Sequence, residues 1–182
     1  MEQPPRTIII GVTGGIGAYK ACDVVRALRK KDYPVQVVMS AAAERFVTRL
    51  SLQTLSGNPV AQDLFSTEYR RKPGHIALAD QAAVIAVVPA TAHTIAKLAG
   101  GFCDDLLSCV ITASRASVLI CPAMNDRMYQ HPAVQANIRR LQEFNYSLLL
   151  PVEGDLACGR RGIGHLADVA EITKEIERLY HA

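Results

Sequence analysis

Short apolar runs alternate with segments of helical spacing along most of the chain. The run TIIIGV at 7–12 is apolar and β-branched, as expected for a strand that is buried on both faces of a parallel sheet. Residues 16–31 then place apolar side chains at helical intervals and end in the letters RKK, whose charges suit a helix C-terminus. This first unit predicts a strand followed by a helix.

The same succession recurs four more times. The further pairs of apolar run and expected helix are 35–39 with a helix opened by Ser40, 83–89 with one from about 94, 117–122 with one from about 132, and 146–151 with one from about 168. Parallel neighbouring strands need such crossover helices. The pattern therefore predicts an α/β fold, a doubly wound parallel sheet of Rossmann or flavodoxin-like type with helices on both faces.

Composition narrows the class of protein. The 182 residues, 49% hydrophobic and 20% charged, are enough for one α/β domain, and no linker or repeat is visible, so 1–182 is predicted to be a single domain. A formal charge of +3 with scattered Lys and Arg predicts neither a nucleic-acid nor a membrane partner. Five cysteines without paired spacing indicate reduced thiols and no metal site. With no signal-peptide pattern at the N-terminus, we expect a cytoplasmic protein.

Ligands of such sheets bind beyond the carboxyl ends of the strands, so the segments that follow strands are expected to converge at one rim. The first, TGGIGAY at 13–19, has glycines that let the backbone approach a phosphate at a helix N-terminus. Thr13 and Ile16 stand where the dinucleotide pattern G-x-G-x-x-G needs glycines, and Ser40 stands where an acidic residue would bind a ribose. A mononucleotide such as FMN is therefore favoured over NAD, with a tight turn that binds nothing as the alternative.

Three later segments carry candidate chemistry. The threonines of PATAHT at 89–94 can bind phosphate or flavin oxygens, or simply cap a helix. PAMNDRM at 122–128 puts an amide between two thioethers, which suggests a polar group held in an apolar pocket. Residues 153–166 contain four glycines and predict a mobile lid. On that lid Cys158 is either a proton donor or an unreactive thiol, and Arg160 either clamps a phosphate or is solvated.

His75 lies in GHIALAD, at a junction between a loop and an expected helix. An imidazole there can act as an acid or base near neutral pH, or it can serve only as a surface or capping residue. The sequence around it leaves both interpretations open.

Together these segments resemble the homo-oligomeric flavin-containing cysteine decarboxylases, among them the enzymes that act on phosphopantothenoylcysteine. The resemblance covers nearly the whole chain and is carried by TGGIGAYK, GHIALAD, PATAHTIAKLAGGFCDDLL, PAMNDRMY and GDLACGRRGIGHLAD. Three positions differ from the usual family pattern: His93 replaces Asn, Arg160 replaces an acidic residue, and His165 stands where Arg is commoner.

The resemblance implies an FMN-dependent conversion of 4′-phosphopantothenoylcysteine to 4′-phosphopantetheine in coenzyme A biosynthesis. In that family the flavin oxidises the cysteine to a thioaldehyde, CO₂ leaves, and the enethiol is reduced again. The transient oxidation creates an electron sink that an unactivated carboxylate lacks. The family also implies a homotrimer or homododecamer with FMN at the subunit contact. Residues 41–56 are candidates for that contact because they expose more apolar surface than one helix needs.

By the same resemblance, residues of this chain receive roles. The expected catalytic residues are His75, Asn125 and Cys158. The expected substrate-binding residues are Met124, Met128, Ala157 and Arg160. The expected FMN-binding residues are Gly14, Gly15, Ser40, Thr91 and Thr94.

Two rival hypotheses remain: a peptidyl-cysteine oxidative decarboxylase of modified-peptide biosynthesis, and a non-catalytic FMN-binding regulatory subunit. Cys158 argues against the first, because relatives that release an enethiol omit the final protonation. His75, Asn125 and Cys158 together argue against the second. A prenylating flavin enzyme is disfavoured because its signatures are not those found here.

Overall fold

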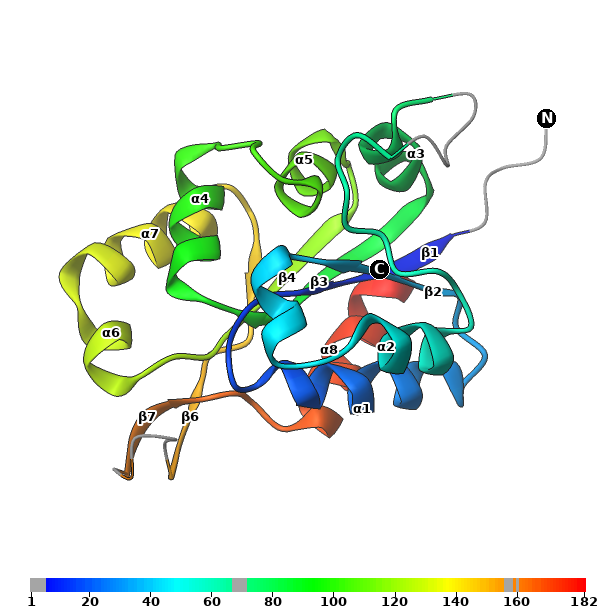
Figure 1. Ribbon diagram of the computed structural model, residues 1–182. Helices are drawn as coiled ribbons and strands as arrows, with labels where there is room; N and C mark the ends of the chain where they lie inside the picture. The colour runs from blue at the N-terminus through cyan, green and yellow to red at the C-terminus, as the bar shows by residue number, and fades with distance from the viewer. Residues whose placement is uncertain (1–5, 67–71, 156–158, 160) are drawn as a thin grey trace.

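Parallel strands form the centre of the computed structural model, which describes residues 6–66, 72–155, 159 and 161–182 (Figure 1). The five-stranded sheet has the order β2-β1-β3-β4-β5, and every pairing in it is parallel. Its strands are β1 (Thr7–Val12), β2 (Val35–Met39), β3 (Ala82–Ala90), β4 (Ser117–Pro122) and β5 (Ser147–Leu148). This order is that of a flavodoxin-like fold, so the predicted fold class is confirmed.

Helices cover both faces of the sheet (Figure 1). One face carries α1 (Ala18–Arg29), α2 (Arg49–Ser56) and α8 (Val169–His181), which share a hydrophobic cluster with β1. The other carries α3 (Gly74–Gln81), α4 (Ala92–Gly100), α5 (Leu106–Ala113) and α7 (Pro132–Glu143), which share a second cluster. The short 3-10 helix η1 (Ala41–Arg45) and α6 (Asp126–Gln130) follow β2 and β4 at the carboxyl edge.

Strand β1 shows how the two clusters are built. Ile8 and Ile10 point into the first cluster and Ile9 into the second, as the period of two of a strand requires. A Cβ atom at Gly11 would lie 2.6 Å from Cδ1 of Leu107. The Leu107 side chain of α5 therefore packs against bare backbone at this position, and a larger residue at position 11 would displace it.

Two regions differ from the sequence prediction. The helix expected to open at Ser40 is instead η1, and α2 begins only after Thr48, whose side chain accepts a hydrogen bond from Ser51 N–H. The stretch 153–166, expected to be a mobile lid, contains an antiparallel hairpin that the sequence did not predict, β6 (Val152–Asp155) and β7 (Arg161–His165), whose tip lies partly outside the described residues. Within the described ranges no helix has the length and apolar character to cross a membrane.

Candidate functional site

A pocket of about 870 Å³ lies at the carboxyl ends of β1, β3 and β4. Its walls come from the loop after β1, the start of η1, the first turns of α4, the turn after β4 and the end of β7. The predicted convergence of the strand-following segments is therefore confirmed. The strand order reverses between β1 and β3, and a crevice at such a switch point is where sheets of this kind bind ligands.

The glycine loop after β1 is pressed against η1. A Cβ atom at Gly14 would lie 2.5 Å from the Cβ of Ala42 and 2.9 Å from its carbonyl carbon, so no side chain fits there. The hydroxyl of Thr13 donates to the Pro89 carbonyl at 2.7 Å and accepts from the Thr91 N–H at 3.3 Å. These bonds tie the loop to the start of α4 and leave the N-terminal end of α1 at the pocket.

Ser40 presents a buried hydroxyl to the pocket wall. Its Oγ has no hydrogen-bond partner among the described residues. A buried polar atom without a partner costs free energy, so this hydroxyl is suited to a polar group of a ligand. The Thr91 hydroxyl is already engaged, because it accepts from Thr94 N–H at 3.2 Å and lies 3.0 Å from the Thr94 hydroxyl.

The turn after β4 is held by the root of the hairpin. Met124 N–H donates to the Gly164 carbonyl at 3.0 Å. Gly164 has a φ of 149°, and a Cβ atom there would collide with the Met124 carbonyl oxygen. The Asn125 side-chain oxygen accepts from Arg127 N–H at 3.0 Å and so caps α6. The Asn125 amide and the Met124 and Met128 thioethers thus share one wall of the pocket.

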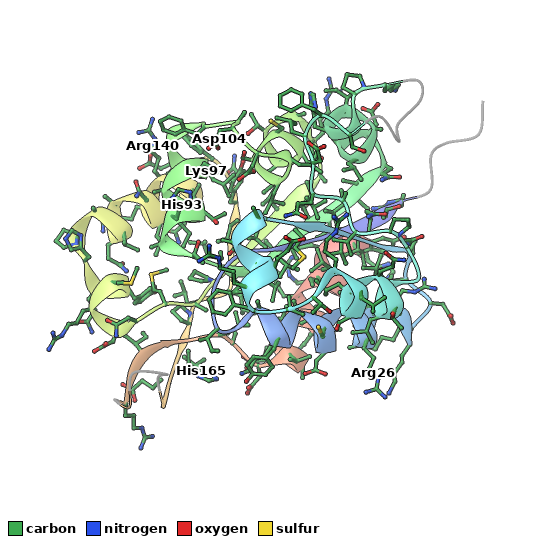
Figure 2. The ribbon with its side chains drawn as sticks, viewed as in Figure 1. Arg26, His93, Lys97, Asp104, Arg140 and His165 are labelled. Carbon is green, nitrogen blue, oxygen red and sulfur yellow. The ribbon has the colours of Figure 1, made fainter. Side chains whose placement is uncertain are left out.

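A compact charge cluster lies at the α4 side of the pocket, where Figure 2 shows His93, Lys97 and Asp104 close together. The Lys97 ammonium lies 2.7 Å from Asp104 and 2.6 Å from Asp105, and its side chain is only 11% exposed. Burial alone would lower the pKa of Lys97, but the hydrogen bonds that its ammonium donates to both carboxylates raise it above its ordinary value. Burial likewise opposes ionisation of Asp105, yet the bonds from Lys97 and Ser108 hold its pKa below the usual range.

The predicted site residues fall into three groups. Those that line the pocket are Gly14, Gly15, Ser40, Thr91, Thr94, Met124, Asn125 and Met128. His75 lies on α3 and is not among the lining residues; its Nδ1 atom is buried without a partner in the described part of the chain. The positions of Ala157, Cys158 and Arg160 lie outside the described residues.

Sequence reasoning assigned no role to four further residues of the pocket wall: Lys20, Lys97, Asp105 and His165. One signal for Lys20 was available, since it lies one helical turn after the glycine loop and therefore on the pocket side of α1. His165 lines the pocket because it ends β7, and the many glycines of this segment gave no sign of a strand. No group of three or more His, Cys, Asp or Glu within the described ranges is placed to hold a metal ion.

Comparison with known proteins gives consistent similarities. A family model with the description Flavoprotein matches residues 1–181. The coenzyme A biosynthesis bifunctional protein CoaBC of Haemophilus influenzae is 42% identical over 172 residues, which cover 94% of this chain and 43% of that protein. A probable phosphopantothenoylcysteine decarboxylase of Streptococcus mutans is 41% identical over 174 residues, with 94% and 97% covered. The chain thus spans less than half the length of the bifunctional relatives it matches.

Solved structures are similar over the whole chain. A cysteine-to-serine mutant of PPC decarboxylase complexed with pantothenoylaminoethenethiol superimposes with a TM-score of 0.87 at 27% identity, and covers 98% of this chain and 100% of that one. The FMN-dependent cysteine decarboxylase SpaF gives a TM-score of 0.80 at 27% identity, with 98% and 99% covered.

Proposed function

This chain belongs to the Flavoprotein family, and we propose that it is an FMN-dependent decarboxylase that converts 4′-phosphopantothenoylcysteine to 4′-phosphopantetheine. The observation that carries the proposal is the pocket at the β1/β3 switch point, which joins a glycine loop, an unpartnered buried Ser40 hydroxyl and the amide of Asn125. The 41% identity to a probable phosphopantothenoylcysteine decarboxylase of nearly the same length supports the substrate.

The residues present fit FMN. The Ser40 hydroxyl, which has no partner among the described residues, and the glycine loop at Gly14 and Gly15, which lines the pocket, would hold its phosphate. Thr91 and Thr94 would lie beside the flavin or its ribityl chain, and Met124 offers an apolar wall to the ring. Bound FMN supplies a reversible two-electron oxidation of the substrate cysteine, which gives the departing carboxylate an electron sink.

Asn125 is proposed to bind the substrate carboxylate through its amide nitrogen. The side-chain oxygen faces the N–H of Arg127, so the amide is held in one orientation at the start of α6. A neutral donor suits this position better than a cation would. A full positive charge would stabilise the ground-state carboxylate and so oppose its conversion to neutral CO₂.

Two thioethers complete the substrate wall. Met124 is half-buried against the second core cluster, and Met128 is 50% exposed at the mouth of the pocket. Both are proposed to exclude water from the substrate thiol. The proposed role of Cys158 as the proton donor of the last step, and of Ala157 and Arg160 as substrate contacts, rests on the family resemblance alone.

A second copy of this chain is proposed to complete the site, in a homotrimer or homododecamer with FMN at the subunit contact. His75 does not line the pocket of its own copy, and its buried Nδ1 has no partner within the described part. Phe46 and Leu50 are 44% and 71% exposed directly after the pocket wall formed by η1. Apolar side chains of this size on one edge are typical of a surface that another subunit covers.

The test is a product analysis with two substrates. We would supply the FMN-loaded protein with 4′-phosphopantothenoylcysteine or with a peptide that ends in cysteine, and measure CO₂ and the thiol products by mass spectrometry. We expect CO₂ and 4′-phosphopantetheine in equal amounts from the first substrate and little reaction with the second. Accumulation of free enethiol, or faster turnover of the peptide, would overturn the proposal in favour of a peptidyl-cysteine decarboxylase.

A further inference from the structure

Two cysteines meet at the start of α5, beside the charge cluster of Lys97. The Cys109 thiol donates a hydrogen bond to the Cys103 carbonyl, with Sγ 3.2 Å from that oxygen. Both thiols are free; Cys103 is exposed and Cys109 is partly exposed. A carbonyl oxygen lies close to the Cα of its own residue, so Cys109 Sγ reaches the backbone of Cys103. A disulfide joins residues whose Cα atoms are about 4.4–6.8 Å apart, and this pair is therefore a candidate for one.

The two thiols also interact electrostatically. Burial is the largest cause that raises the pKa of the Cys109 thiol, and the neighbouring Cys103 thiol is the next. The thiolate is the form that attacks a disulfide bond, so Cys109 is poorly suited to react first. The exposed Cys103 is the thiol that an oxidant meets first, and Cys109 lies behind it as the second.

The other described cysteines are placed differently. Cys22 is half-buried in α1 and Cys121 is fully buried in β4. Burial is the largest cause that raises the pKa of each of these thiols. Among the cysteines that the structure describes, Cys103 is thus the one exposed thiol, and Cys109 is its neighbour.

The pair flanks the N-cap of α5. Asp105 is the N-cap residue and forms a capping box with Ser108. Cys109 is the fourth residue of the helix, and Cys103 lies two residues before the cap. Apolar side chains at closely similar positions often pack on each other and fix the direction in which the chain enters a helix. A bond between Cys103 and Cys109 would fix that direction covalently.

The segment between the cysteines holds one wall of the pocket. Asp104 and Asp105 both pair with Lys97 of α4, and Figure 2 shows Asp104 beside Lys97. Lys97 and Asp105 also line the pocket. The ion pairs use the carboxylates of this segment, whereas the contact between the cysteines uses a thiol and a carbonyl. Closing a disulfide does not require these ion pairs to break, and it would hold the segment on α5.

We infer that Cys103 and Cys109 are a redox-active pair that closes to an intrachain disulfide in reaction with a small-molecule disulfide of the glutathione class. The Cys103 thiolate attacks one sulfur of the oxidant, whose S–S bond breaks and whose other half leaves as a thiol; a mixed disulfide remains on Cys103. Cys109 then loses its proton to solvent and attacks the Cys103 sulfur, which releases the second thiol. Two protein thiols are thereby oxidised by two electrons, and one disulfide is reduced to two thiols.

Trypsin places the pair in one peptide, because it cleaves after Lys97 and Arg115 and the peptide 98–115 contains only these two cysteines. The FMN-loaded protein would be equilibrated in glutathione buffers of increasing oxidised fraction. It would then be unfolded, alkylated and digested, and the peptide measured by mass spectrometry. We expect two alkyl groups on the peptide from reduced buffer. From oxidised buffer we expect no alkyl group and the loss of two hydrogen atoms.

Two variants separate the two steps. Cys109→Ser removes the second thiol, so the peptide should keep one glutathione on Cys103. Cys103→Ser removes the first thiol, so Cys109 should keep its alkyl group. The peptide 21–26 with Cys22 is the internal control and should stay alkylated in every sample. The inference is overturned if the wild-type peptide keeps both alkyl groups in fully oxidised glutathione, or carries glutathione without an internal disulfide.

The disulfide should also stabilise the start of α5. It closes a short ring, from residue 103 to residue 109, which removes a modest entropy from the unfolded chain. We therefore expect oxidised wild type to melt about 4–8 °C above the reduced protein, with no comparable rise for Cys109→Ser. A lower melting temperature of the oxidised wild type would mean that the bond strains the turn, and would overturn its stabilising role.

Discussion

Ser40→Ala should change stability and cofactor affinity in opposite directions. The Ser40 hydroxyl is buried and has no hydrogen-bond partner within the described part of the protein. In the flavin-free protein it is therefore a cost, and an unpaired buried polar atom costs about 1–3 kcal/mol. With FMN bound, we expect the same hydroxyl to donate to the phosphate, where a hydrogen bond to a charged group contributes about 1.5–3 kcal/mol.

These values give two measurable effects. We expect the flavin-free variant to be more stable than wild type by about 1 kcal/mol, which raises the melting temperature by about 2–4 °C for a chain of this size. We expect its Kd for FMN to rise about tenfold to a hundredfold. Excess FMN should accordingly raise the melting temperature of the variant less than that of wild type.

The assay is thermal unfolding of flavin-free protein by circular dichroism, combined with titration by FMN. Ser56→Ala is the matched control, because Ser56 is fully buried but accepts from Asn58 N–H at 3.2 Å and lies 3.1 Å from the Asn58 carbonyl oxygen. That variant should lose stability and keep its FMN affinity. If Ser40→Ala lowers the melting temperature and leaves the Kd for FMN unchanged, Ser40 has a structural role and the reasoning is refuted.

Three further substitutions test other parts of the site. Asn125→Asp should retain FMN but stop CO₂ release, because a carboxylate would face the substrate carboxylate; activity within about tenfold of wild type would contradict this role. Gly164→Ala should lower the free energy of unfolding by about 2 kcal/mol or more, because the new Cβ atom would meet the Met124 carbonyl and the backbone φ at this position is 149°. The measurement is a urea titration, and an unchanged midpoint of unfolding would count against the contact between the hairpin and Met124. Asp105→Ala should cost about 1–2 kcal/mol at pH 7 through loss of the α5 cap. The pKa of Asp105 in the folded protein is depressed below its ordinary value of 3.8. The loss of stability in the variant should therefore be complete well above pH 3.8 and should shrink as the pH falls through the pKa of the folded protein. A loss of stability that persists in acid would contradict the role of the ionised Asp105 carboxylate as the cap of α5.

The central strands could be predicted because their apolar runs are short, rich in β-branched residues and followed by segments of helical spacing. Ile8, Ile9 and Ile10 are all fully buried, as expected for a strand covered on both faces. Helix α5 could not be predicted in the same way. Its sequence LLSCVITA is buried at five of eight positions, so it shows neither the period of an amphipathic helix nor that of a half-exposed strand.

The hairpin could not be predicted for a related reason. Glycines at 154, 162 and 164 suggest a loop when they are read locally. In the structure Gly162 and Gly164 lie where any side chain would press on Asp126 or on the Met124 carbonyl. These glycines are needed because a distant segment of the chain packs against them. In the local sequence, glycines required by packing look the same as glycines of a flexible loop.

Much of the candidate site could be predicted because parallel strands end at the same edge, which brings together Gly14, Ser40, Thr91 and Asn125. Lys20 Nζ lies 2.9 Å from His165 Nε2, and this contact depends on a one-residue bulge in β7; such a change of face leaves no mark in the sequence. His75 was assigned to the site by family resemblance, and one copy of the chain does not bring it to the pocket.

The most direct test of the account is the yield of CO₂ from 4′-phosphopantothenoylcysteine, measured for the same protein preparation stripped of flavin and after reloading with FMN. The account predicts no CO₂ from the stripped protein and, after reloading, repeated turnover with one phosphopantetheine formed for each CO₂. Equal CO₂ release without flavin, or none from fully loaded protein, would contradict it.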